Sequence, residues 1–331
     1  MWRTVYLALI SGFIAPLHLD ADDHGAKGKV APEKHAKAEP KCPDHVAKAR
    51  PRTALGQPGR PNTSMSMPEF FMRMGQGFAT NPAGAFPSML KELGELEGPA
   101  LEGTKLSLVE EREAGRKARD EYLRQAQANG HATLRDAAKL AKLRALVDEF
   151  APMMKHRDRY PKIEITLIDA PIPDGQAFPG GFLVFTSALL EGAEVESAPG
   201  VVAHELAHLE LGHLYQYAKR GKLAESTYAS PPGAGATFDQ SFTKQMALLG
   251  LLMNPYRPEH ELEADCVAVT WMERLGHDPM TLADFFERLH RRLGDQPNDP
   301  VFGFALGRSH PYSLDRKSHV ERRVKQLRRA G

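Results

Sequence analysis

Residues 201–213 read VVAHELAHLELGH and carry five titratable side chains on a stretch that otherwise resembles a core helix. On an α-helix each residue advances about 100°, so His204 and His208 differ by roughly 40° and point the same way. Two imidazoles one turn apart on one face can bind a single Zn²⁺ ion. Glu205 lies about 60° from His208, close enough to act on a water at the metal without being a ligand. The spacing therefore predicts two metal ligands and one general base.

The alternative interpretation is a polar helix face with solvated histidines. Apolar flanks on both sides of the motif favour burial instead, and buried histidine and glutamate need partners. If the helix continues to about Tyr217, His213 lies about 140° from His208 and is expected to face elsewhere, which makes it a poor third ligand. The longer pattern H-E-x-x-H-x-x-G-x-x-H needs Gly at 211 and His at 214, and both positions are Leu here.

A third ligand must come from another element, and residues 259–269, EHELEADCVAV, are the best candidate. Glu261 and Asp265 are four residues apart and share one face of a helix. Glu261 can supply a carboxylate oxygen to the metal, and Asp265 can accept the outer N–H of a ligand histidine. The alternative is an amphipathic helix with a solvated acidic stripe. Three protein ligands leave the fourth zinc position open, which is typical of a catalytic site.

Hydrolysis of a peptide at such a site needs a donor for the oxyanion that develops on the attacked carbonyl. The segment 309–316, SHPYSLDR, offers His310 and Arg316 for this task.

Helix-forming composition and capping signals predict the elements that position these residues. Helices are expected over 106–127, 134–154 (with Thr133 as N-cap), 197–217, 258–275 and 281–293, and in a basic C-terminal stretch. Residues 162–170, KIEITLIDA, alternate as a strand does, and 182–190, FLVFTSALL, begin as a strand and run into a short helix. Residues 173–181, PDGQAFPGG, have turn chemistry, and 220–242 are expected to form a long loop. The pattern predicts an α+β fold that is mainly α.

The chain has 331 residues, of which 42% are hydrophobic and 26% charged, as in ordinary globular proteins. A net charge of +1 gives no strong field toward nucleic acid, so no nucleic-acid partner is expected. Two cysteines, Cys42 and Cys266, are too few for a disulfide scaffold. A single bridge between them is disfavoured, because Cys42 lies in a segment of disordered composition.

The N-terminus, MWRTVYLALISGFIAPLHLDADD, resembles a secretory signal with cleavage after Ala21. Residues 1–21 are therefore interpreted as a signal peptide, 22–66 as a disordered linker, 67–104 as an irregular Met/Phe-rich segment and 105–331 as the catalytic domain. We expect an exported protein, in the periplasm or outside the cell. An uncleaved N-terminal segment that associates the protein with a membrane, and a peripheral membrane contact, are the alternatives.

Five segments occur in the order found in the HtpX/Ste-type zinc metallopeptidases, the group of the CAAX prenyl proteases and their soluble envelope relatives, and together they resemble that family over about residues 105–325. These segments are LSLVEEREAG, QAFPGGFLVFTSALL, VVAHELAHLELGH, ELEAD and SHPYSLDR. The resemblance implies a zincin-like (gluzincin) catalytic domain with a small β-sheet beside the active-site helix. It implies one Zn²⁺ per chain and protein or peptide substrates.

Carried over residue by residue, the resemblance implies zinc ligands at His204, His208 and Glu261. It implies that Glu205 is the general base and that Asp265 is the carboxylate behind a ligand histidine.

The resemblance also implies that His310 stabilises the transition state with support from Arg316. The segment GGFLVF, with Gly180, Gly181 and Phe182, corresponds to the family's strand beside the cleft, where an extended substrate can pair with the backbone. This chain has Gln176 where the family usually has Asn, so substrate contacts near that turn are not carried over.

The expected function is therefore a zinc-dependent endopeptidase, with a role in envelope protein quality control by analogy with the family. The alternative is a metal-containing, chaperone-like or binding protein with little or latent proteolytic activity. The family's membrane members carry transmembrane helices inside the catalytic domain, and their absence here argues against prenylated substrates within the bilayer. The loop expected at 220–242 is a candidate cover for the site. The pattern does not predict the oligomeric state.

Overall fold

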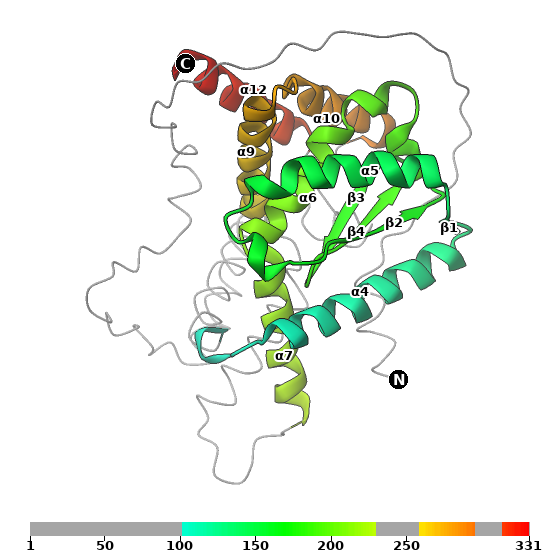
Figure 1. The fold of residues 1–331 in the computed structure, drawn as a ribbon, viewed down its shortest axis with the longest axis vertical. Coiled ribbons are helices and arrows are strands. Elements are labelled where there is room, and N and C mark those ends of the chain that lie inside the picture. Colours follow the sequence, from blue (N-terminus) through cyan, green and yellow to red (C-terminus); the bar gives the residue numbers. More distant parts are fainter. Residues whose placement is uncertain (1–100, 230–257, 295–312, 331) are drawn as a thin grey trace, which may run out of the picture. The chain divides into compact units, whose positions relative to one another are not determined.

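The computed structural model describes residues 101–229, 258–294 and 313–330 (Figure 1). It divides into two compact units, and each is considered by itself. Within the described chain, one unit holds residues 108–215, 258–294 and 313–330, and the other holds 101–107 and 216–229. The expected signal peptide, linker and Met/Phe-rich segment up to residue 100 lie outside the described residues. Across the part that is described, every helix is too short or too polar to cross a bilayer.

A four-stranded mixed sheet forms one layer of the larger unit. Its strands are β1 (Thr133–Leu134), β2 (Glu164–Ile168), β3 (Gly175–Phe178) and β4 (Phe182–Thr186), in the order β1-β2-β4-β3. β4 runs parallel to β2 and antiparallel to β3, so both of its edges are paired. β3 is therefore an edge strand of the sheet.

The two faces of this sheet are covered by different helices (Figure 1). On β4, Leu183 and Phe185 face the main core with α5 (Ala137–Phe150) and α6 (Ala198–Glu210). Phe182 and Val184 face the opposite way, into a smaller apolar cluster with α4 (Leu108–Ala128). The alternation follows from the two-residue period of a strand and buries both faces of β4.

Three further helices extend the main core around α6. They are α9 (Pro258–Leu275), α10 (Met280–Leu293) and α12 (Ser313–Ala330). Their buried apolar side chains belong to the same cluster as those of α6. Short 3₁₀ turns connect the elements at Ala151–Met153, Arg157–Arg159, Ser187–Leu190 and Gly192–Glu196. The mainly helical α+β fold with a small sheet is confirmed.

Two local expectations differ from the structure. Thr133 is not a helix cap, because it pairs with Ile168 in β1, and the side chain of Asp136 instead accepts a hydrogen bond from the Lys139 N–H at 3.0 Å as the N-cap of α5. The segment expected as a turn at 173–181 contains β3, whose four residues pair with β4.

The helix expected to run from 197 to 217 is broken. α6 ends at Glu210, Gly212 adopts a φ of 73°, and α7 (His213–Ala229) begins at once. A left-handed residue cannot continue a right-handed helix, and glycine adopts this conformation at little cost. The prediction of a loop at 220–242 is wrong for residues 220–229, which belong to α7. The rest of that loop, which was the candidate cover for the site, lies outside the described residues.

Cys266 is fully buried on α9 and is disulfide-bonded. The expectation that a bridge is disfavoured is therefore not supported. Cys42 lies outside the described residues.

Candidate metal centre

The helix that carries the H-E-x-x-H motif is enclosed by the core. Pro199 lies in its first turn, where a missing N–H costs nothing, and every residue from Val201 to Leu209 is buried. His204, Glu205 and His208 are 3%, 1% and 6% exposed. The alternative of a solvated polar face is thereby excluded for this helix.

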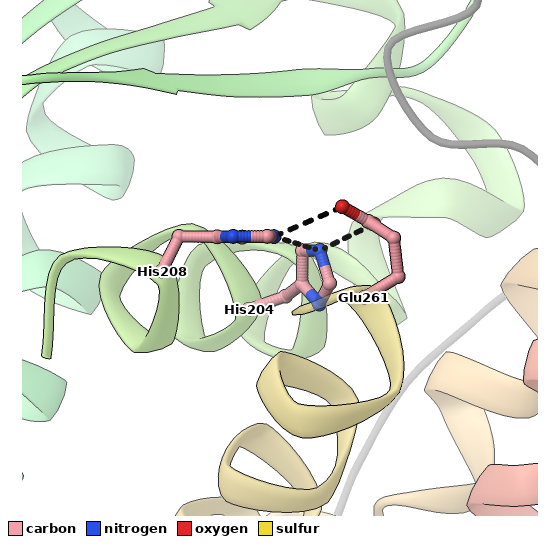
Figure 2. Close-up of side chains that lie close together, drawn as sticks. All are labelled: His204, His208 and Glu261. Carbon is pink, nitrogen blue, oxygen red and sulfur yellow. Dashed lines mark hydrogen bonds and ion pairs between the residues drawn. The ribbon is translucent and has the colours of Figure 1, made fainter. Parts of the chain in front are cut away.

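Two histidines from α6 and one glutamate from α9 converge on one point (Figure 2). The Nε2 atoms of His204 and His208 lie 3.0 Å apart. Glu261 places Oε2 at 3.3 Å from Nε2 of His204 and Oε1 at 3.4 Å from Nε2 of His208. Donor atoms bound at 2.0–2.1 Å around a tetrahedral ion lie about 3.3 Å from one another. The three side chains therefore fit a tetrahedral metal ion and leave its fourth position to another group.

Behind His204, Asp265 fixes the orientation of the ring. Oδ1 of Asp265 lies 2.9 Å from Nδ1 of His204, so Nδ1–H donates to the carboxylate and Nε2 keeps its lone pair for a metal. Arg316 donates from Nε and Nη2 to the two oxygens of Asp265 at 2.8 and 2.7 Å. Burial by itself raises the pKa of Asp265, but Arg316 and His204 outweigh it and lower that pKa to about 2. Asp265 is thus a carboxylate at every physiological pH.

Three carboxylates are buried at this centre. Glu205, Glu261 and Asp265 are each at most 2% exposed, and Arg316 is a buried cation that contacts Glu261 and Asp265. Burial and Arg316 lower the pKa of His204, but its contacts with Asp265 and Glu261 outweigh them and raise that pKa. A cluster of buried carboxylates of this kind suits a divalent cation at the three donor atoms.

The carboxylate of Glu205 is held by the edge of the sheet. Its Oε2 accepts a hydrogen bond of 2.7 Å from the backbone N–H of Ala177 on β3. Gly175 allows this close approach of β3 to α6, because a Cβ there would come within 2.9 Å of both Phe185 and Val201. The base candidate is therefore anchored to the strand nearest the motif.

Arg316 lies beside the candidate metal-binding side chains. Besides Asp265, it contacts Oε2 of Glu261 at 3.2 Å, and its guanidinium lies 4.1 Å from the ring centroid of Phe286. These contacts make Arg316 a partner of the two carboxylates, and the support expected from it for His310 stays a prediction. His310, expected as the oxyanion donor, lies outside the described residues.

The residues expected to form a substrate-binding strand do not lie at an unpaired edge of the sheet. Gly180 and Gly181, with φ of 74° and 86°, form the turn between β3 and β4, and a Cβ on Gly180 would overlap the backbone of Arg112 on α4. Phe182 opens β4, both of whose edges are paired. Gln176 is buried on β3, where its Nε2 donates to the carbonyl oxygen of Ala177 at 3.1 Å. Among the described strands, β3 rather than GGFLVF is the edge next to α6.

One residue at the site was not predicted from the sequence. His213 was expected to face away, but its Nδ1 lies 3.1 Å from Nδ1 of His208. The signal that points to this arrangement is Gly212, a common residue just past a helix end, which makes an unbroken helix through His213 a poor assumption.

Comparison with known proteins agrees with this geometry. More than half of the chain, residues 137–324, matches the family described as peptidase family M48. The chain is 28% identical over 163 residues to the beta-barrel assembly-enhancing protease of Escherichia coli (strain K12), covering 46% of this chain and 32% of that protein. It is 24% identical over 150 residues to metalloprotease LoiP of the same strain, covering 45% of this chain and 57% of that protein. The match thus spans only part of the length of these relatives.

Proposed function

The chain belongs to peptidase family M48, and on that premise we propose that it is a zinc-dependent endopeptidase with its active centre on α6 and α9. The observation that carries the proposal is the convergence of His204, His208 and Glu261 at distances that suit one tetrahedral ion. The histidine and carboxylate donor set is one that zinc accepts in hydrolytic enzymes. The three buried carboxylates at this centre suit a divalent cation.

Zinc, when bound there, supplies a Lewis acid that polarises the scissile carbonyl and makes water a stronger nucleophile. Glu205 accepts the proton of the attacking water and returns it to the leaving amine. The Ala177 N–H holds one oxygen of this carboxylate, which limits its rotation and keeps it on the side of β3. Asp265 and Arg316 hold His204 and Glu261 in place.

An extended substrate is proposed to pair with the outer edge of β3, and not with GGFLVF. The reason is that β4 has both edges occupied, whereas β3 is an edge strand next to the motif helix. Backbone pairing of this kind binds many sequences, because the main chain supplies the hydrogen bonds. Substrate specificity then depends on side-chain contacts.

The test is Glu205→Gln. This variant should bind zinc as the parent protein does and should lose hydrolysis of casein, because an amide cannot take up the proton of water. Glu196→Gln is the matched control, since Glu196 is an exposed carboxylate just before α6 and should leave both properties unchanged. Zinc content is measured by atomic absorption and hydrolysis by release of soluble peptides. Retained hydrolysis in Glu205→Gln would reject its role as base. A zinc-loaded parent protein without any turnover would favour the chaperone-like or binding alternative.

Export and a role in envelope protein quality control are part of the same proposal. The first rests on the signal-like residues 1–21, and the second on similarity to a protease whose name links it to β-barrel assembly. Residues 105–331 are proposed as the catalytic domain. Mass spectrometry of the exported protein should find an N-terminus at Asp22, whereas an intact Met1 in a membrane fraction would indicate an anchor.

A further inference from the structure

The two histidines of the proposed zinc site contact different residues through their Nδ1 atoms. His204 meets the carboxylate of Asp265 directly, at 2.9 Å. His208 turns Nε2 toward the other metal-binding atoms and Nδ1 toward a third histidine, His213, at 3.1 Å. His213 in turn places its Nε2 at 3.1 Å from Oε2 of Glu263. His213 is 6% exposed, so this contact lies inside the protein.

The arrangement depends on the end of α6. Gly212, at a φ of 73°, interrupts the helix, and α7 begins directly after it at His213. The ring of His213 also stacks on that of His260 from α9, with ring centroids 4.0 Å apart and planes 4° from parallel. The stacking and the contact with Glu263 both restrict rotation of the His213 ring.

We propose that His213, oriented by Glu263, is a positioning residue that fixes the tautomer and the ring plane of His208 for metal binding. The proposal rests on the zinc site proposed above. If Nε2 of His208 gives its lone pair to a metal, Nδ1 of the neutral ring carries the hydrogen and needs an acceptor.

Nδ1 of His213, at 3.1 Å, can accept only when the hydrogen of that ring is on Nε2. Nε2–H then donates to Glu263. Of the tautomers open to the two neutral rings, this pair alone satisfies all three contacts. Glu263 therefore selects the tautomer of His213, and His213 selects that of His208.

Two substitutions separate this role from a structural one. In His213→Asn the side-chain Oδ1 lies about where Nδ1 was and can still accept from His208, although the contact with Glu263 is lost. In His213→Gln the amide lies near the former Nε2 and can still meet Glu263, but the acceptor beside His208 is lost. Both variants replace a buried ring by a smaller amide, so a general loss of packing affects both.

The measurement is the zinc dissociation constant of the metal-free full-length protein, titrated in competition with a chromophoric chelator. His213→Gln should bind zinc about 10–100-fold more weakly than the parent protein, the range found when an outer partner of a ligand histidine is removed. His213→Asn should stay within about threefold of the parent, since the acceptor is kept. Glu263→Leu should weaken binding in the parent but have no further effect in His213→Asn, where no tautomer needs to be selected.

Several results would overturn the inference. His213→Gln binding zinc as tightly as the parent would do so, and so would His213→Asn binding as weakly as His213→Gln. Urea unfolding of the metal-free variants identifies a packing effect, because that effect lowers the unfolding midpoint of both variants alike while leaving their zinc affinities equal. A parent protein that binds no zinc would refute the proposed function itself, which is a different outcome from a parent that binds zinc and a His213→Gln variant that binds it equally well.

Discussion

Replacing Arg316 by Met is expected to destabilise the metal-free protein by about 3–5 kcal/mol, the usual cost of removing one partner from a buried ion pair. Arg316 is 3% exposed, and Met retains much of its apolar volume while removing the charge. The loss of stability therefore reflects mainly the buried carboxylates that no longer contact a guanidinium, and only to a small extent a cavity.

The size of the effect follows from what Arg316 contacts. It forms two hydrogen bonds to Asp265, at 2.8 and 2.7 Å, and lies 3.2 Å from Glu261. Both carboxylates are at most 2% exposed, so neither can recover hydration when the guanidinium is removed. Arg328 on the same helix provides the contrast. It forms ion pairs with Glu273 and Asp278 at 3.2 and 3.3 Å, but its own side chain is 56% exposed.

The assay is urea unfolding followed by circular dichroism, in a buffer that contains a chelator so that no metal compensates the charge. Arg328→Met is the matched control and should cost below about 1 kcal/mol, as exposed pairs do. Asp265→Asn in the Arg316→Met background should restore part of the loss, because it removes one of the two buried carboxylates that Arg316 contacts. If Arg316→Met and Arg328→Met lowered the free energy of unfolding by amounts within about 0.5 kcal/mol of each other, the reasoning from burial would be refuted.

Three further predictions concern the ligands, the metal and the packing of β3. Glu261→Gln should lower the zinc content measured by atomic absorption to a small fraction of the parent's, because a neutral amide is a weaker ligand than a carboxylate; a stoichiometric load would place the third ligand elsewhere. Chelation should lower the thermal midpoint and added zinc should restore it, since a ligand at a thousand times its dissociation constant stabilises by about 4 kcal/mol; an unchanged midpoint would contradict metal binding to the folded state. Gly175→Ala should destabilise by about 1–3 kcal/mol, as overpacking does, because its Cβ meets Phe185 and Val201 at 2.9 Å, whereas Gly103→Ala meets nothing within 4 Å. Equal unfolding midpoints for these two variants would contradict the close approach of β3 to α6.

The features predicted correctly from the sequence are those encoded within one element. The helix expected at 258–275 is present as α9, with the same bounds, because helix formers and a proline start are local signals. The proximity of His204 and His208 follows from the helical repeat alone. Glu261 could be proposed because four-residue spacing puts it on the face of Asp265, and the packing of α9 on α6 then brings it to the two histidines.

The features that were missed depend on contacts between segments. Residues 173–181 contain Pro, Asp and Gly at turn positions, so the sequence alone favours a turn there. They nevertheless include β3. The turn at Gly180 and Gly181 lets β4 pair with β3, and Gly175 lets β3 pack closely against α6. Thr133 failed as a helix cap for the same reason, since its pairing with Ile168 comes from a strand more than thirty residues away. Neither partner can be identified from the local pattern.

The position of the His213 ring depends on the backbone conformation of one residue, Gly212. An unbroken helix would carry this ring about 140° away from His208. With Gly212 in the left-handed region, α6 stops and the His213 ring contacts His208. The same dependence holds for Arg316, which reaches Asp265 from a helix 51 residues further along the chain. The two candidate histidine ligands thus come from short-range spacing, whereas Glu261 and the groups that orient the histidines come from a helix end and from helix packing. Variants at His213 and Arg316 therefore test the tertiary structure of the site, which variants of the H-E-x-x-H motif by themselves do not.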